Sequence, residues 1–188
     1  MPFKKYKSLR LKDYDYTLPG AYFITICVKD RKCLFGNVSG GVMILNAVGK
    51  IVQNEMINIA THYQNIEVGE NIVMPNHVHM VVYIYELTGV RQVVTPTKRI
   101  RLQDVVGSYK SGASREIRKI KGCENFRWQR YYHDHRIRND KALVNISQYI
   151  RLNPVNWAED IENELYVMGI TQKERTDKAK KFYKNLTK

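Results

Sequence analysis

The alternation of hydrophobic and polar positions along the chain predicts a mixture of strands and amphipathic helices. The apolar run that follows Pro19-Gly20 is typical of a buried strand, and apolar residues at helical spacing after Asn46 indicate a helix with one buried face. Two extended segments on either side of Pro75-Asn76 have the pattern of an antiparallel pair. In chain order the pattern predicts a strand at 21–28, a helix at 47–63, strands at 66–74 and 77–85, a helix at 101–119, a strand at 128–137 and a helix from about 139 to 154.

This order of elements indicates the fold class. Strand, helix, strand, strand, helix, strand is the βαββαβ order of ferredoxin-like folds, in which helices cover one face of an antiparallel sheet. The seventh element adds a helix after the last strand. With 188 residues and no internal repeat, a single core is the simplest division. We therefore expect an α+β protein.

The charge balance indicates the class of partner. The chain has 31 Lys and Arg against 18 Asp and Glu, a net charge of +13, which attracts polyanions. The 13 Tyr, 5 Phe and 2 Trp among these basic residues suit unstacked bases better than a lipid surface. Backbone phosphates are expected to bind the basic face of the second helix, two arginines of the last strand and the basic N-terminus, namely Lys110, Arg115, Arg118, Lys119, Arg130, Arg136, Lys4, Lys5 and Arg10.

Compartment signals are few. No apolar run approaches the ~20 residues that a membrane-spanning helix needs, and no signal-type stretch follows the basic N-terminus, so we expect a cytoplasmic protein with no membrane partner. Cys27, Cys33 and Cys123 form neither a CxxC pair nor an even disulfide set, which indicates reduced thiols.

The segment from Pro75 to Met80 carries the clearest chemical pattern. In a strand, positions i and i+2 point to the same face, so His77 and His79 point together while Val78 points to the other side. Two imidazoles on a rigid strand are half of a divalent metal site. The alternative interpretation is a pair of histidines on an exposed sheet face that contacts nothing.

A tyrosine and an amide close the third helix. Tyr149 and Asn153 are four residues apart and therefore share one helix face, separate from the core stripe formed by Leu143, Ile146 and Ile150. They could place a nucleophile and a metal ligand at one point. Alternatively, Tyr149 is a boundary tyrosine and Asn153 simply ends the helix before the following proline.

A third pattern lies between Trp128 and Arg138. Two-residue alternation there places Arg130, Tyr132 and Arg136 on one face and Tyr131, His133 and His135 on the other. Arginines and aromatics interleaved on a sheet could bind phosphates and stack bases, although they could also protect an edge strand by charge. The second H-x-H pattern, His133 and His135, is a weaker metal candidate because no nearby residue completes the set.

Taken in order, these motifs closely resemble the REP-associated tyrosine transposases, relatives of the insertion-sequence transposases that use a single tyrosine and a His-hydrophobic-His motif. The resemblance covers about residues 9–160, so we expect a single nuclease domain at 1–160 and a basic C-terminal tail at 161–188. It rests on Tyr14-Asp15-Tyr16, Pro19 to Phe23, Val73 to His79, Ser108 to Ser111, Trp128 to Tyr132, His135 to Asn139, Tyr149-Ile150 and Asn153-Pro154.

The resemblance implies a set of roles. His77 and His79 would hold Mg²⁺ or Mn²⁺, Asn153 would complete the metal site, and Tyr149 would be the nucleophile. The substrate would be single-stranded DNA beside an imperfect hairpin, cleaved through a 5′-phosphotyrosyl intermediate and rejoined. The protein would be a monomer or homodimer associated with a prokaryotic nucleoid. No Gly-rich phosphate loop is present, so no nucleotide cofactor is expected.

Three other functions remain open at this point. A non-catalytic nucleic-acid-binding protein would explain the charge and the aromatics equally well. A hydrolase that uses a metal-bound water would cleave without the tyrosine. An RNA-binding protein is the third, because ferredoxin-like sheets often bind single-stranded RNA.

Overall fold

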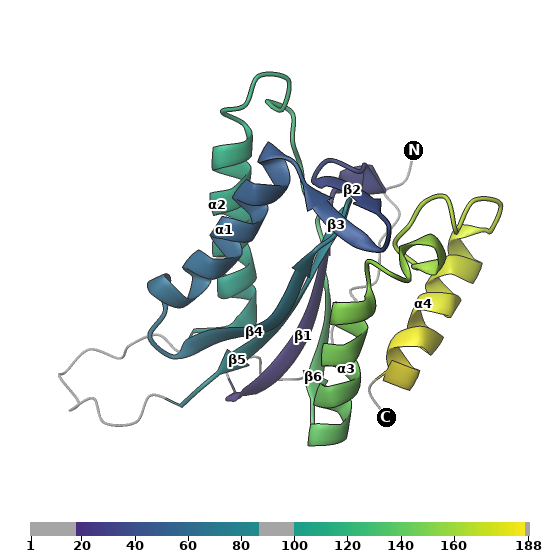
Figure 1. The fold of residues 1–188 in the computed structure, drawn as a ribbon. Coiled ribbons are helices and arrows are strands. Elements are labelled where there is room, and N and C mark those ends of the chain that lie inside the picture. The colour runs from purple at the N-terminus through teal and green to yellow at the C-terminus, as the bar shows by residue number, and fades with distance from the viewer. Residues whose placement is uncertain (1–17, 87–99, 187–188) are drawn as a thin grey trace, which may run out of the picture.

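The computed structural model describes residues 18–86 and 100–186. Its centre is a four-stranded antiparallel sheet with the strand order β4-β5-β1-β6 (Figure 1). The strands are β1 (Gly20–Cys27), β4 (Ile66–Val73), β5 (His77–Ile84) and β6 (His133–Ile137), and a separate hairpin contains β2 (Gly36–Ser39) and β3 (Val42–Leu45). The helices are α1 (Ala47–His62), α2 (Leu102–Ile117), α3 (Asp140–Leu152) and α4 (Gln172–Leu186), with short 3₁₀ turns η1 (Lys29–Arg31) and η2 (Trp157–Glu159).

The strand order confirms the ferredoxin-like prediction. The second and third strands of the βαββαβ unit form the hairpin β4-β5, and β1 lies between that hairpin and the last strand, β6. In β1, Thr25 pairs with His79 of β5 on one side and with His133 of β6 on the other. Register therefore places the two H-x-H segments on either side of the same central strand.

Residues on β1 alternate between two cores. Tyr22, Ile24 and Ile26 belong to the larger core, which α1 and α2 cover. Phe23 belongs to the smaller core on the opposite face, which α3 and α4 cover (Figure 1). Helix α3, which carries Tyr149, therefore packs on the face of the sheet that α1 and α2 leave open.

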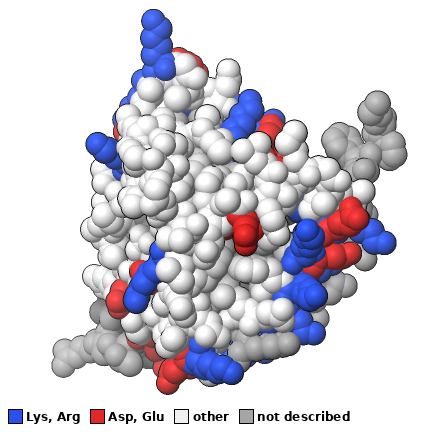
Figure 2. Space-filling view, turned by 45° about the vertical axis from the view of Figure 1, so that its right-hand side comes forward, with Lys and Arg blue, Asp and Glu red and all other residues white. Residues whose placement is uncertain are grey.

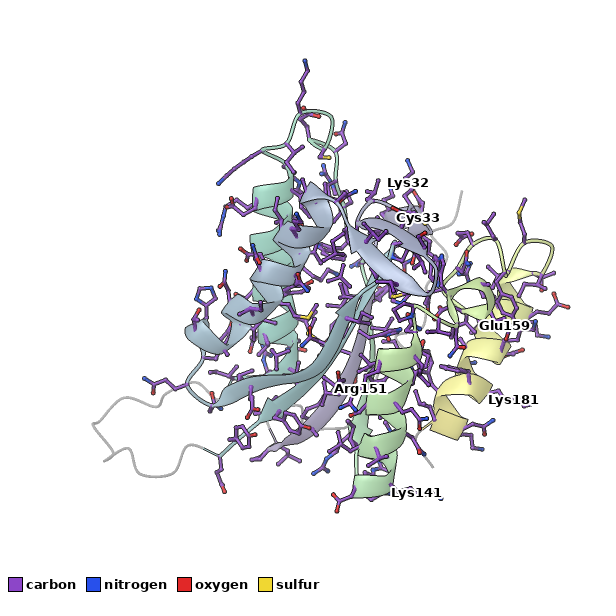
Figure 3. All side chains as sticks on the ribbon, viewed as in Figure 1. Lys32, Cys33, Lys141, Arg151, Glu159 and Lys181 are labelled. Carbon is purple, nitrogen blue, oxygen red and sulfur yellow. The ribbon has the colours of Figure 1, made fainter. Side chains whose placement is uncertain are left out.

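The α3 helix follows the sequence signals that predicted it. Asn139 is its N-cap, with the side-chain oxygen accepting a hydrogen bond from the Ala142 amide at 2.8 Å. Ile146 and Ile150 are fully buried against the sheet. Arg151 reaches the β4 edge, where its guanidinium pairs with Glu70 at 2.6 Å (Figure 3). The position of Tyr149 and Asn153 is thus set by the apolar packing of α3 on the sheet.

The prediction of one strand from 128 to 137 was wrong for its first half. Only residues 133–137 form β6, and Trp128 makes an isolated bridge with Val28. The Gln129 N–H still bonds the Cys27 carbonyl at 2.9 Å, but the carbonyls of Gln129 and Arg130 accept from the Lys110 ammonium, at 2.7 and 3.3 Å. The two-residue alternation therefore applies only within β6.

Two glycines in helices provide a test of the packing. A Cβ on Gly49 in α1 would clash with the Phe35 carbonyl oxygen, whereas a Cβ on Gly107 in α2 would meet no described atom within 4 Å. We expect Gly49→Ala to lower the free energy of unfolding by about 1–3 kcal/mol through overpacking. Gly107→Ala, the matched control, should raise it by up to about 1 kcal/mol through helix propensity. Urea denaturation measures both, and equal effects would contradict the packing around α1.

Within residues 18–86 and 100–186, the structure contains no helix that is both long and apolar enough to span a membrane.

Candidate active site

The two histidines of β5 converge on one point inside the protein. Both side chains are fully buried, and their Nε2 atoms lie 3.0 Å apart. They occupy alternate positions of β5 on the face that α3 covers, as the strand period predicted. The alternative interpretation, an exposed pair that contacts nothing, is therefore wrong.

Each imidazole is oriented by a polar side chain behind it. Nδ1 of His77 lies 2.8 Å from the side-chain oxygen of Asn76, and Nδ1 of His79 lies 2.9 Å from the hydroxyl oxygen of Thr25. These outer contacts leave both Nε2 atoms to face the interior of the site. Metal-binding histidines in proteins are commonly held in this way.

Tyr149 reaches the same point from α3 of the same chain. Its hydroxyl oxygen lies 3.0 Å from His79 Nε2, and its ring packs edge-on against Phe23 with the centroids 6.2 Å apart. A single chain therefore brings the tyrosine to its own histidines.

Asp160 is a further residue of the site, and no motif in the sequence indicates it. Its carboxylate accepts hydrogen bonds from the Asn153 amide group at 2.5 Å and from the Glu162 backbone N–H at 2.6 Å, and it lies 3.2 Å from the Tyr149 hydroxyl. It follows η2 in an irregular segment, where no periodic pattern assigns a direction to the side chain. The sequence signal was only an acidic residue close behind the Tyr149–Asn153 motif.

The donor set fits a divalent cation. Ligand atoms of His77, His79 and Asp160 all lie within 4.8 Å of one another. The side-chain oxygen of Asn153 is buried and has no hydrogen-bond partner among the described residues, as expected for an oxygen that serves another ligand. A mixed set of imidazole nitrogens and carboxylate or amide oxygens suits Mn²⁺ better than Mg²⁺, which prefers oxygen alone.

Burial determines the protonation of the site. It lowers the pKa of His77 to about 4 and that of His79 well below its usual value, so both imidazoles are neutral at pH 7 and able to bind a metal. Burial, together with the charge of Asp160, raises the pKa of Tyr149 well above 10. The phenol is therefore protonated in the resting protein and must lose its proton to act as a nucleophile.

A buried ion pair lies behind the histidines. Glu162 accepts from Arg31 Nε at 2.7 Å and lies 4.0 Å from the guanidinium of Arg175 on α4. Burial alone would raise the pKa of Glu162, but these cations and nearby His77 outweigh it and hold the pKa at about 2. The tail after residue 160 is thus packed against the site rather than separate from it.

Of the four basic residues of the second helix that were expected to bind phosphates, two bind backbone carbonyls of the protein and two are exposed. The Lys110 ammonium binds the carbonyls of Gln129 and Arg130, and the Arg118 guanidinium binds the carbonyl of Phe126, so both stabilise the segment before β6. Arg115 and Lys119 are exposed, and each pairs with Glu116 at the surface. Lys4, Lys5 and Arg10 lie outside the described residues.

A groove runs between β6 and α4 beside the histidines. Its volume is about 500 Å³, and its lining includes Thr25 and Glu162 from the surroundings of the site. Arg136 lines the groove, and Arg130 lies over the ring of Tyr131, which also lines it. Its basic residues are Arg31, Arg136, Arg138, Arg175, Lys180 and Lys184, and its aromatic residues are Tyr131, Tyr132 and Tyr183. In the face drawn in Figure 2, Lys and Arg lie around the outline, and several at the right are mixed with Asp and Glu.

The second H-x-H pattern is placed differently. His133 stacks on Tyr183 of α4 with the ring centroids 3.9 Å apart, and both His133 and His135 line the groove. Neither belongs to the His77, His79 and Asp160 group. Among the described residues, that group is the one His, Cys, Asp and Glu cluster with metal-binding spacing.

Comparison with known proteins identifies one relative by sequence and a solved structure with a similar fold. No family model matches the chain. It is 36% identical over 171 residues to an uncharacterized protein of Haemophilus influenzae, covering 86% of this chain and 93% of that protein. A solved REP-associated tyrosine transposase bound to a REP hairpin shares the fold with a TM-score of 0.55 and 19% identity, covering 79% of this chain and 74% of that one. A Deinococcus radiodurans protein described as a transposase has a TM-score of 0.44, 20% identity and coverage of 75% and 95%.

Proposed function

We propose that this chain is a metal-dependent enzyme that cleaves DNA and transfers the cleaved strand. The chain belongs to the same protein family as its Haemophilus influenzae relative, and it has the fold of a REP-associated tyrosine transposase. His77 and His79 fit the His-hydrophobic-His motif of the single-tyrosine transposases. A transposase-type enzyme is the function that this combination supports best.

One observation carries the proposal. The Tyr149 hydroxyl lies 3.0 Å from His79 Nε2, in a cluster with His77, Asp160 and an unpartnered amide oxygen of Asn153. A nucleic-acid-binding module has no need of a buried phenol beside two neutral imidazoles and a carboxylate. The nucleophile and the candidate ligands His77, His79, Asn153 and Asp160 are assembled within one chain.

The chemistry follows from these positions. A divalent ion bound by the imidazole nitrogens and oxygen ligands would withdraw electron density from a phosphate and orient it. The Tyr149 oxygen attacks phosphorus, and when the metal is held by His77, His79 and Asn153, the Asp160 carboxylate 3.2 Å away accepts the phenol proton. The bond from phosphorus to the 3′ oxygen breaks, the leaving oxygen takes a proton from solvent, and the upstream strand departs with a 3′-hydroxyl while the downstream strand stays on Tyr149 through its 5′-phosphate. Attack by a 3′-hydroxyl reverses the step and joins strands.

The substrate we propose is single-stranded DNA with imperfect hairpins. The solved REP-associated transposase of the same fold is bound to a REP hairpin. The groove between β6 and α4 supplies basic and aromatic side chains beside the site, which suit a phosphate backbone and unstacked bases. Because His77 and His79 are fully buried, entry of the scissile phosphate requires side chains around them to shift.

The direct test is transfer of a labelled strand to the protein. The full chain is incubated with Mn²⁺ and a pool of hairpin-containing single strands labelled at the 3′ or the 5′ end, then denatured in detergent. We expect the 3′ label to migrate with the protein, and the 5′-labelled fragment to be released with a 3′-hydroxyl that a polymerase extends. Sequencing the captured strands identifies the hairpin. Cleavage that leaves neither label on the protein would instead indicate hydrolysis by water.

Two exposed basic residues at the C-terminal end of α2 and just beyond it, Arg115 and Lys119, allow a separate test of binding. We expect the double substitution of Arg115 and Lys119 by alanine to weaken hairpin binding and to flatten its salt dependence by about 0.7 in log–log slope for each phosphate that is no longer neutralised. Lys110→Met should instead lower stability, because the Gln129 and Arg130 carbonyls lose their donor. Fluorescence anisotropy at several salt concentrations and urea denaturation separate the two effects. If the double variant had an unchanged slope, Arg115 and Lys119 would not contact DNA phosphates.

A further inference from the structure

Asn76 forms the end of the turn between β4 and β5 and precedes the first histidine. Its side chain is fully buried, and the orientation of its amide group is determined by two neighbours. Nδ2 lies 3.1 Å from the Arg31 carbonyl oxygen and 2.8 Å from the Glu162 carbonyl oxygen. Carbonyl oxygens only accept hydrogen bonds, so the NH₂ group must face them and the amide oxygen must face the opposite way.

That orientation decides which nitrogen of His77 carries hydrogen. The Asn76 oxygen lies 2.8 Å from His77 Nδ1 and can only accept, so Nδ1 must donate. A neutral imidazole with its proton on Nδ1 has a free lone pair on Nε2, which is the nitrogen that faces His79 and the metal cluster. The contact between His79 Nδ1 and the Thr25 hydroxyl does not fix the tautomer of His79, because a hydroxyl can either donate or accept.

The two carbonyls that hold Asn76 are themselves tied together. Arg31 Nε donates to the Glu162 carboxylate at 2.7 Å, and Arg175 on α4 donates to the Ile161 carbonyl at 2.9 Å. Arg31 adopts a left-handed backbone conformation, with φ of 49°, in the turn after β1. The loop after β1 and the segment before α4 therefore meet at Asn76.

We propose that Asn76 is a positioning residue that holds His77 in the Nδ1–H tautomer, with its Nε2 lone pair available for a divalent cation, and that the Arg31–Glu162 pair keeps Asn76 in place. The inference rests on the proposed function only in treating His77 as a metal ligand. It also gives residues of the tail a role in the metal site, through the Glu162 carbonyl and the Arg175 contact.

The tautomer is measured on the unaltered protein. Long-range ¹H–¹⁵N correlation spectra of the full chain with ¹⁵N-labelled histidines, recorded in EDTA at neutral pH, distinguish protonated from unprotonated ring nitrogens. The chain has five histidines, and single His→Gln variants assign their signals. We expect His77 to carry its proton on Nδ1. A proton on Nε2 would overturn the proposal, and this outcome does not depend on any variant of Asn76 folding.

Metal affinity gives the second readout. Titration with Mn²⁺ alone, followed by electron paramagnetic resonance without DNA, should show a Kd raised by roughly 10–100-fold in Asn76→Ala. Asn71→Ala on β4, where an exposed amide donates to the nearby Gly69 carbonyl at 2.8 Å, is the matched control and should bind Mn²⁺ as the wild type does. A folded Asn76→Ala with wild-type affinity would contradict the inference. The expected tautomer and affinity together with no covalent adduct on DNA would contradict the proposed function alone.

Discussion

Replacing Tyr149 with phenylalanine is expected to abolish the covalent protein–DNA adduct, with a loss on the order of 1,000-fold or more, because the variant has no oxygen to attack phosphorus. The fold should be retained, since the ring at this position still packs against Phe23 and Phe182 and the substitution removes only the hydroxyl that reaches His79 and Asp160. Detergent gels of labelled strands measure the adduct, and anisotropy measures hairpin binding, which should remain close to that of the wild type.

The matched control is Tyr85→Phe. Tyr85 follows β5 at the end opposite to the histidines, is half exposed, and donates its hydroxyl hydrogen to Glu67. It should form the adduct at the wild-type rate. If Tyr149→Phe still became attached to DNA, another residue would have to be the nucleophile. If it still cleaved DNA without attachment, a metal-bound water would be the attacking group.

The second large effect is expected from removal of either imidazole. His77→Ala and His79→Ala should each weaken Mn²⁺ binding by more than the roughly 10–100-fold that removal of an outer partner costs, because a direct ligand is removed. At a fixed Mn²⁺ concentration the yield of adduct should fall together with the Mn²⁺ affinity, while hairpin binding in EDTA should persist. Calorimetric titration of Mn²⁺ into each variant measures the affinity.

His62→Ala is the control for these variants. His62 ends α1, is exposed, and lies on the other face of the sheet. Its substitution should change neither affinity nor adduct yield. Because His77 and His79 are buried, thermal denaturation of each variant shows whether the fold survives. Wild-type Mn²⁺ affinity in a folded His77→Ala or His79→Ala would place the metal elsewhere.

Much of the architecture could be predicted because helix caps and the periods of strands and helices depend on residues close together in the sequence. Asn46 and Asn139 cap the first and third helices as Asn residues do, and each side-chain oxygen accepts from the backbone N–H three residues on. The periods of strand and helix place His77 beside His79 and Tyr149 above Asn153, since those relations depend only on backbone geometry. The strand expected at 128–132 was wrong: the Gln129 N–H still bonds the Cys27 carbonyl, but the Gln129 and Arg130 carbonyls bind Lys110, a contact between distant parts of the chain that no local period encodes.

The residue types and their spacing specify two histidines on one strand face, and a tyrosine and an amide on one helix face. Long-range packing brings these faces together, buries the histidines and adds Asp160 to them. Helix α3 packs on the sheet face that α1 and α2 leave open, and this packing removes water from the imidazoles and joins groups 70 and more residues apart in the chain. Such contacts arise from long-range packing, and no period along the sequence encodes them.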